Sequence, residues 1–258
     1  MLLLLSLLFI ILLGLSLGSF GSMLLYRIPR GETLGGRSHC THCQTSLHWY
    51  DLVPLMSFLA LRGRCRACKK RISWKYPLIE ITTALLFLFL ALALPPMSIF
   101  ALLFLAVATY MLILIAFEDF ETQKIPDLFI TIAFLSALLF RVFHAPTGGE
   151  TEMRDAFLGA SLPLLFFGAL CIMSHEEWIG SGDILLGTMI GLLLGVKLTL
   201  LALFFAYVGG ALIASLLILL HIVKAKGALA FAPFLSGGAL LALFFGERFL
   251  LWYTNVAF

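Results

Sequence analysis

Long runs of apolar residues, broken by short polar turns, dominate the pattern of this 258-residue chain. Most runs approach the 20 or so residues that a helix needs to cross the hydrocarbon of a bilayer. None alternates polar and apolar positions in the way that barrel strands do. The pattern therefore predicts an all-α membrane protein with about eight transmembrane helices, at residues 2–25, 78–94, 97–117, 128–143, 156–174, 184–196, 198–223 and 228–245.

Composition agrees with this class, because 62% of the residues are hydrophobic and only 12% are charged, about half the charged share of a soluble domain. The charge is unevenly placed. Residues 27–77 form the only long polar segment and hold ten of the 17 Lys and Arg. An excess of basic residues marks cytoplasmic loops, so we expect three regions: a first span at 1–26, a cytoplasmic domain at 27–77 and a multi-span domain at 78–258.

The basic charge of residues 27–77 can be explained in two ways. Membrane orientation and attraction to anionic lipid headgroups account for it. Nucleic acid is the alternative, but no aromatic groove or nucleic-acid motif accompanies the charge. We therefore expect lipid and not nucleic acid as the partner of this segment.

Four cysteines in the polar segment form two CxxC pairs, Cys40–Cys43 and Cys65–Cys68. Two such pairs match the ligand number and spacing of a closed tetrahedral zinc site, and a segment of this size needs a metal to stabilise it. A thiol-redox role is the alternative, which a cytoplasmic location disfavours. We expect structural Zn²⁺. Histidines at 39, 42 and 48 are predicted to be solvated neighbours, and Cys171 a packing residue.

A second motif, Gly180-Ser181-Gly182-Asp183, lies between the apolar runs 156–174 and 184–196. An acidic residue at a membrane boundary predicts a functional site. The alternative is that Gly182 ends one helix and Asp183 caps the next. Another acid, Asp119, follows the run 97–117, and two crossings separate the two. Both are therefore expected at the cytoplasmic side, whereas the loop 144–155 is predicted to be a solvated connector.

Two aspartates that meet share one proton, because adjacent like charges do not both ionise easily. The ionised member activates a water, and the protonated member polarises the scissile carbonyl and serves the leaving amine. This chemistry predicts peptide hydrolysis. Glycines at 180 and 182 allow a substrate backbone to approach. The nearby acids are expected to attract a basic peptide or, alternatively, to be a solvated cluster: Glu118, Glu121, Glu176 and Glu177.

The ordered set of motifs resembles the bacterial type IV prepilin peptidases, which are leader peptidase/N-methyltransferases. The resemblance runs nearly end to end: Gly18-Ser19-Phe20, Tyr26–Pro29, Cys40–Cys43, Trp49–Leu55, Leu61–Cys65, Cys68, Ile72-Ser73, Tyr76–Glu80, Asp119 seven residues before Pro126, and the GxGD motif Gly180–Asp183. Three positions depart from the family pattern. Ser22 stands where Asn is usual, Glu118 replaces an apolar neighbour, and Leu185 replaces a Lys.

This resemblance implies a bifunctional enzyme of the bacterial inner membrane. Asp119 and Asp183 would cleave the basic leader of type IV prepilins or type II secretion pseudopilins. The new N-terminal residue would then be methylated with S-adenosylmethionine, and we expect that activity in the cytoplasmic domain, including Glu80. Two alternatives stay open from the sequence: a membrane thiol-redox protein that uses the CxxC pairs, and a non-enzymatic assembly or transport component.

Overall fold

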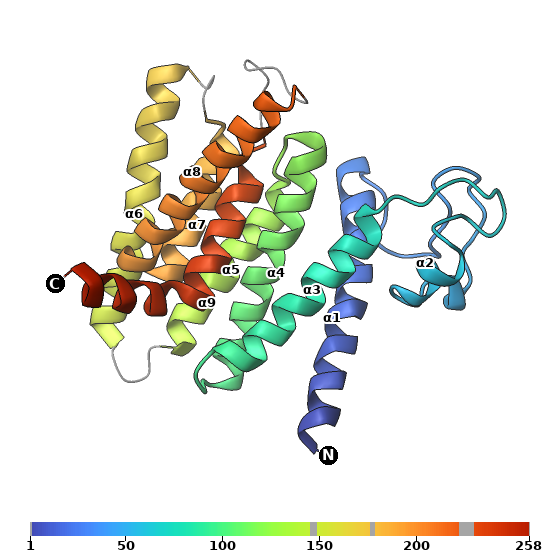
Figure 1. The fold of residues 1–258 in the computed structure, drawn as a ribbon, viewed down its shortest axis with the longest axis horizontal. Helices are drawn as coiled ribbons and strands as arrows, with labels where there is room; N and C mark the ends of the chain where they lie inside the picture. Colours follow the sequence, from blue (N-terminus) through green and yellow to red (C-terminus); the bar gives the residue numbers. More distant parts are fainter. Residues whose placement is uncertain (1, 145–148, 176–178, 222–229, 258) are drawn as a thin grey trace. The chain divides into compact units, whose positions relative to one another are not determined.

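The computed structural model describes residues 2–144, 149–175, 179–221 and 230–257 (Figure 1). These residues form α-helices, two short 3₁₀ helices and two isolated β-bridges, with no strand among them. In chain order the elements are α1 Leu2–Arg27, η1 Ile28–Arg30, η2 Trp49–Asp51, α2 Met56–Ala60, α3 Lys75–Ala93, α4 Ile99–Thr122, α5 Asp127–His144, α6 Gly149–Ser174, α7 Ser181–Leu194, α8 Val196–Leu219 and α9 Ala232–Ala257.

The predicted fold class is confirmed. Within the described residues, seven helices are long and apolar enough to cross a membrane. The one predicted span that is not among these seven, residues 184–196, corresponds to α7. Its 14 residues extend about 21 Å at 1.5 Å per residue, which is shorter than a hydrocarbon core about 30 Å thick. The protein is therefore a multi-pass membrane protein in which one short apolar helix packs among longer ones.

Two predicted boundaries were wrong. α6 begins at Gly149, seven residues before the predicted span, because the acidic residues that suggested a connector occupy its first turns. Acids in a first turn favour the positive end of the helix dipole. α9 continues to Ala257, well past residue 245, because Phe249, Leu250 and Leu251 extend its apolar pattern beyond Glu247 and Arg248.

The chain divides into two compact units, Met1–Leu94 and Pro95–Phe258, called here the N-terminal unit and the C-terminal unit. In the N-terminal unit α1 lies along α3 (Figure 1). The close approach depends on two glycines one turn apart. A Cβ added to Gly14 would lie 2.6 Å from Ala84 Cα, and one added to Gly18 would lie 2.5 Å from Glu80 Cα. Small residues at this spacing let membrane helices touch backbone to backbone.

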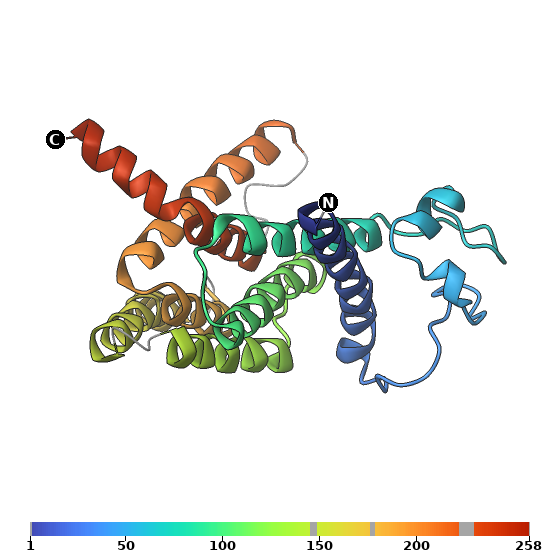
Figure 2. The same cartoon turned by 90° about the horizontal axis from the view of Figure 1, so that it is seen from below.

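In the C-terminal unit neighbouring helices pair along the chain, α4 with α5, α6 with α7, and α8 with α9 (Figure 2). Packing of α4 on α9 and of α5 on α7 closes the bundle. The centre is α4, in which every residue from Ala108 to Ile115 is buried. A helix that is apolar and buried all round belongs inside a bundle. The long-range pairs matter for the site because α4 and α7 each carry one of the two predicted catalytic aspartates.

Candidate functional site

Asp119 lies near the C-terminal end of α4 and is 6% exposed. The helix ends three residues later at Thr122, and the next residue, Gln123, adopts a left-handed conformation and donates its N–H to the Asp119 carbonyl at 2.9 Å. A carboxylate is unfavourable at the negative end of a helix dipole. Here the start of another helix offsets this effect: the N–H of Ala232, the first residue of α9, donates to Asp119 Oδ2 at 3.1 Å. α9 therefore fixes the carboxylate.

Asp183 lies in the first turn of α7, and its backbone N–H donates to the Gly180 carbonyl at 3.1 Å. The helix-cap interpretation of this residue was wrong. Gly180 is the N-cap, and no side chain caps the helix there. Because Asp183 lies inside the first turn, its carboxylate makes no capping hydrogen bond to the helix. The Asp183 side chain is half-buried and is therefore available to the site.

The structure brings the two aspartates together, although 64 residues separate them along the chain. Their carboxyl groups repel one another electrostatically. The turn after α4 contributes to this proximity, because a Cβ added to Gly182 would lie 3.2 Å from the Ile125 side chain. A larger residue at 182 would press on Ile125, which the following Pro126 holds extended. The GxGD glycine therefore lets the start of α7 approach the end of α4.

The predicted substrate-binding residues are placed unequally. Glu121 and Gly180 are exposed and Gly182 is partly exposed, whereas Glu118 is only 3% exposed. Glu177 lies outside the described residues. Leu185, where the resembling family has a Lys, is 48% exposed. Among the described members of the predicted acidic cluster, Glu121 is therefore the one that places a negative charge on the surface at this end of the bundle.

Sequence reasoning missed an aromatic group beside Asp183. Tyr207 of α8 interacts electrostatically with Asp183. Its ring packs on Phe231 at 5.2 Å between centroids and on Phe167 at 6.4 Å. Phe231 directly precedes Ala232, so the same turn supports Asp119 and this aromatic group. A single tyrosine in a long apolar span gave no signal in the sequence, because only tertiary packing places it near an acid.

The loop prediction for residues 144–155 was also wrong where the structure describes it. Arg141 of α5 is 8% exposed, donates from Nε to the Leu192 carbonyl at 2.9 Å, and interacts with Asp155. Asp155 also accepts the Val196 N–H at 3.4 Å, at the turn between α7 and α8. Asp155 is therefore not a solvated residue but half of a charge pair that anchors the end of α7.

The four cysteines of the N-terminal unit converge. Their Sγ atoms all lie within 4.8 Å of one another, and those of Cys40 and Cys68 are 4.0 Å apart. A tetrahedral zinc with bonds of about 2.3 Å places its sulfur ligands about 3.8 Å apart, so the quartet fits a metal ion of that kind. None of the three predicted neighbouring histidines belongs to this cluster. The sequence-based ligand set can therefore hold a metal ion.

The two CxxC turns are built alike. In each, the first cysteine donates its N–H to the carbonyl five residues on, and the residue four on returns an N–H to the cysteine carbonyl. The returning residues, Gln44 and Lys69, both have a φ of 58°. Hydrogen bonding by Thr45 lowers the pKa of the Cys43 thiol to about 6, and the Cys68 N–H lowers the pKa of Cys65. Thiolates are the form that binds metal.

Known proteins match the chain along nearly all of its length. The family model described as the bacterial peptidase A24 N-terminal domain matches residues 12–94, and the model of the type IV leader peptidase family matches residues 106–215. A Bacillus subtilis (strain 168) prepilin leader peptidase/N-methyltransferase is 35% identical over 255 residues, 98% of this chain and 99% of that protein. The chain belongs to the type IV leader peptidase family.

Other relatives carry the same or a related description. The Aeromonas hydrophila prepilin leader peptidase/N-methyltransferase is 32% identical over 85% of this chain and 75% of its own length. An Escherichia coli O78:H11 type 4 prepilin-like proteins leader peptide-processing enzyme is 31% identical over 92% of this chain and 93% of its own length. No solved structure matches. The family predicted from the sequence is confirmed, and neither the redox protein nor the assembly component is favoured.

Proposed function

We propose that this protein cleaves the basic leader from type IV prepilins, or from type II secretion pseudopilins, and then methylates the new N-terminal amine with S-adenosylmethionine. The observation that carries the peptidase assignment is the meeting of Asp119 and Asp183 in a chain of the type IV leader peptidase family. Two carboxyl groups at one site supply a base and an acid without a metal or a covalent intermediate.

The proposed hydrolysis follows from this pair. One ionised aspartate takes a proton from a water molecule, whose oxygen attacks the scissile carbonyl carbon. The protonated partner donates its proton to the carbonyl oxygen, which gives a diol intermediate. The first aspartate then gives the proton that it took from water to the leaving nitrogen, the partner recovers a proton from one diol hydroxyl as the carbonyl re-forms, and the C–N bond breaks. The N–H of Ala232 orients the Asp119 carboxylate for this work. Each aspartate changes protonation state, so replacing either carboxyl group by an amide removes the reaction.

Mass spectrometry of a co-expressed prepilin tests the peptidase proposal. We expect Asp119→Asn and Asp183→Asn each to lower cleavage at least about 1,000-fold, because general acid–base catalysis is lost. The matched control is Asp127→Asn, an exposed acid in the first turn of α5 that touches neither aspartate. Unchanged cleavage by either site variant, with normal accumulation of the protein, would refute the proposal.

Substrate attraction is assigned to the acidic end of the bundle. We propose that Glu118, Glu121 and Glu177 favour the basic leader and that Gly180 and Gly182 admit its backbone. Glu121 gives the sharper test because its side chain is exposed. Glu121→Lys is expected to raise KM and to leave kcat nearly unchanged, since an exposed charge acts mainly on encounter. A drop in kcat at constant KM would contradict this role.

Structural zinc is the metal we propose for Cys40, Cys43, Cys65 and Cys68, whose separations suit tetrahedral sulfur coordination. When bound, the ion would crosslink the two CxxC turns and contribute folding free energy. Metal analysis of the purified protein is expected to give about one equivalent of zinc per chain. Less than half an equivalent with intact thiols would argue against it.

Orientation follows from charge. We propose that residues 27–77 and both aspartates face the cytoplasm of the bacterial inner membrane, because this segment holds ten of 17 basic residues. Lipid headgroups are then its neighbours. A membrane-impermeant amine reagent is expected to label Lys69, Lys70 and Lys75 only after permeabilisation of the inner membrane. Labelling in intact spheroplasts would reverse the orientation.

A further inference from the structure

Large apolar side chains are exposed in residues 31–74, the polar segment between the first two membrane spans. Met56, Leu59 and Trp74 are 66%, 68% and 69% exposed. Such exposure is ordinary for a helix that lies in lipid. In a polar segment, however, an exposed apolar surface marks a site of interaction with a membrane or a protein.

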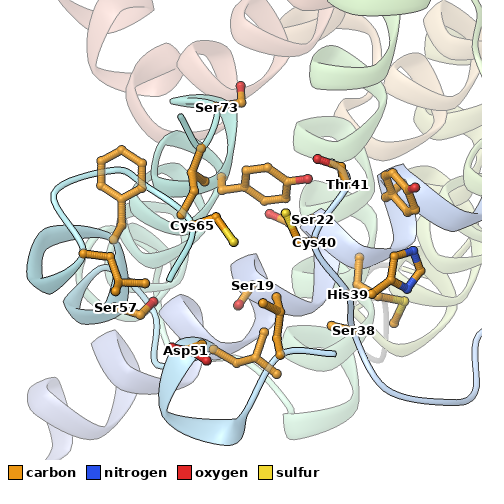
Figure 3. Close-up of a pocket in the computed structure, with 18 of the residues that line it drawn as sticks. Ser19, Ser22, Ser38, His39, Cys40, Thr41, Asp51, Ser57, Cys65 and Ser73 are labelled. Atoms are coloured by element: carbon orange, nitrogen blue, oxygen red, sulfur yellow. The ribbon is translucent and has the colours of Figure 1, made fainter. Parts of the chain in front are cut away.

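The five residues of α2, Met56–Ala60, give this helix an inner and an outer face. Ser57 and Phe58, on the inner face, line a cavity of about 400 Å³ in the N-terminal unit (Figure 3). Met56 and Leu59 are not part of that lining, and their spacing of three residues places them together on the helix surface. The exposed side chains of α2 therefore lie on the outside of the cavity wall.

Trp74 connects the outer face of α2 to a membrane span. Its ring packs on that of Phe58 at 5.0 Å between centroids. Trp74 is also the N-cap of α3, one of the seven helices long and apolar enough to cross a membrane. Exposed residues follow it along α3 at intervals of three or four: Leu78, Ile81, Leu85, Phe89 and Leu92. This spacing places them on one face of the helix, so Trp74 begins an exposed apolar stripe, and α2 lies where that stripe enters the membrane.

Two arginines oppose each other in the same segment. Arg64 and Arg71 form an antiparallel bridge around the second CxxC turn, and both side chains are exposed. Like charges directly opposite one another are destabilising, and among the described residues neither arginine has an ion-pair partner. Arg66, by contrast, donates to Asp51 Oδ1 at 2.8 Å. The guanidinium groups of Arg64 and Arg71 are therefore available to an anion from outside the chain.

A short chain of contacts places this arginine pair next to α2. The Ile72 N–H donates to the Gly63 carbonyl at 2.7 Å, and each of these residues adjoins one of the two arginines. Gly63 in turn faces the Phe58 ring, because a Cβ there would lie 3.1 Å from Phe58 Cζ. The exposed apolar residues and the arginine pair are therefore neighbours around Phe58.

We propose that the outer face of α2 anchors this unit to the membrane surface. Met56, Leu59 and Trp74 enter the apolar part of the bilayer, and the arginine pair binds the phosphates of anionic phospholipids. Apolar side chains flanked by basic ones are typical of elements that lie in the plane of the interface. Arginine binds phosphate through paired hydrogen bonds, and anionic lipid attracts basic segments. The choice of leaflet rests on the proposed orientation, which puts residues 27–77 at the cytoplasmic side.

Photolabelling from lipid tests this anchor. The full-length protein, without prepilin, is placed in phosphatidylglycerol nanodiscs that carry a diazirine in the acyl chains, and mass spectrometry maps the labelled residues. We expect label on residues 56–59 and 74, and on Leu78 and Ile81 as the internal control for lipid contact. The exposed residues 44–46 of the first CxxC turn are the negative control. Label on α3 without label on residues 56–59 would overturn the proposal.

The charge of the lipid tests the arginine pair. Replacing phosphatidylglycerol by phosphatidylcholine is expected to lower the labelling of residues 56–59 by about fivefold, the effect of one basic side chain near an anionic surface. Arg64→Gln combined with Arg71→Gln should remove this dependence on lipid charge. Arg37→Gln, at an exposed arginine of the same segment, is the matched control and should keep it. Equal labelling of the unmodified protein in both lipids would overturn the role of the arginines.

Two features of this design keep its outcomes separate. The comparison of the two lipids uses the unmodified protein, so it decides the matter even where the double variant fails to accumulate. The nanodiscs contain no prepilin, so the labelling does not depend on peptidase activity. A protein that is labelled as expected but leaves a prepilin uncleaved would overturn the proposed function alone.

Discussion

The N-terminal and C-terminal units are stabilised in different ways. Between residues 28 and 76, Cys65 alone is buried, so this segment has almost no apolar core. In the C-terminal unit eight consecutive residues of α4 are buried, and close backbone contacts recur between helices. The first depends on a few polar anchors, and the second distributes its stability over many contacts. We therefore expect a single substitution or the loss of a metal to destabilise the N-terminal unit more than the C-terminal unit.

The polar anchors of the N-terminal unit can be named. Arg27, only 5% exposed, donates to four carbonyls, those of Thr33, Leu34, Gly35 and Arg37, at 2.6–3.1 Å. One guanidinium thus holds the chain that leads into the first CxxC turn. The metal proposed for the cysteine quartet would hold the rest, and together the two anchors would replace the hydrophobic burial that the segment lacks.

Metal removal is expected to have the largest effect on stability. If it had little effect, the proposed difference between the two units would be wrong. Structural zinc contributes on the order of 10 kcal/mol in small domains, far more than the folding free energy that this segment has available. Chelation under reducing conditions should therefore expose residues 31–74 to trypsin, which cuts after its many basic residues, while residues 95–258 stay intact. Continued protease resistance after complete metal loss would show that the quartet is not the anchor.

Asp155→Asn asks whether the C-terminal unit also depends on a single anchor. The substitution removes the stronger of the two acidic partners of the buried Arg141 guanidinium, Asp155, and leaves Glu152. Breaking a buried charge pair completely costs about 3–5 kcal/mol, so this substitution should cost part of that amount. We expect the melting temperature to fall by several degrees, measured on detergent-solubilised protein. The control is Glu150→Gln, an exposed acid in the same helix, and equal behaviour of the two variants would contradict the anchor role.

Gly191→Ala tests the distributed packing and should cost less, about 1–3 kcal/mol, because neighbouring helices can shift to relieve overpacking. A Cβ at Gly191 would lie 2.6 Å from the Gly159 carbonyl carbon, which forces α6 and α7 apart. The same thermal assay measures the cost. Gly168→Ala is the control, since nothing lies within 4 Å of a Cβ there. A neutral Gly191→Ala would show that α6 and α7 do not need this contact.

The smallest effect is expected from Leu185→Lys, which restores the residue usual in the resembling family. Leu185 is 48% exposed, and a lysine there can extend to the interface. Exposed substitutions change stability by about 0.5 kcal/mol at most, and a rate effect of that size is about a factor of two. Prepilin cleavage is the measurement. A tenfold change would mean that position 185 acts directly on the aspartate pair.

The sequence by itself determined the fold class, the four cysteines that can hold a metal ion and the candidate aspartates. Helix lengths follow from runs of apolar residues, since a bilayer sets the length that a span needs. The cysteine quartet follows from two CxxC spacings, because a tetrahedral site needs four ligands in two local pairs. Asp119 and Asp183 stood out because acids at membrane boundaries are costly. These are local signals, and each is readable within a few residues.

Only the tertiary structure decided which distant groups meet. Packing of α4 on α9 supplies Asp119 with the Ala232 N–H, and α8 brings Tyr207 to Asp183. The partnership of Arg141 and Asp155 was misread from sequence, because a charge near a helix end looks solvated until a neighbouring helix covers it. The hydrogen bond from the Leu55 N–H to the Glu80 carboxylate could not be predicted from the sequence either. Such contacts depend on how helices pack, and the apolar pattern of each helix does not specify its neighbour.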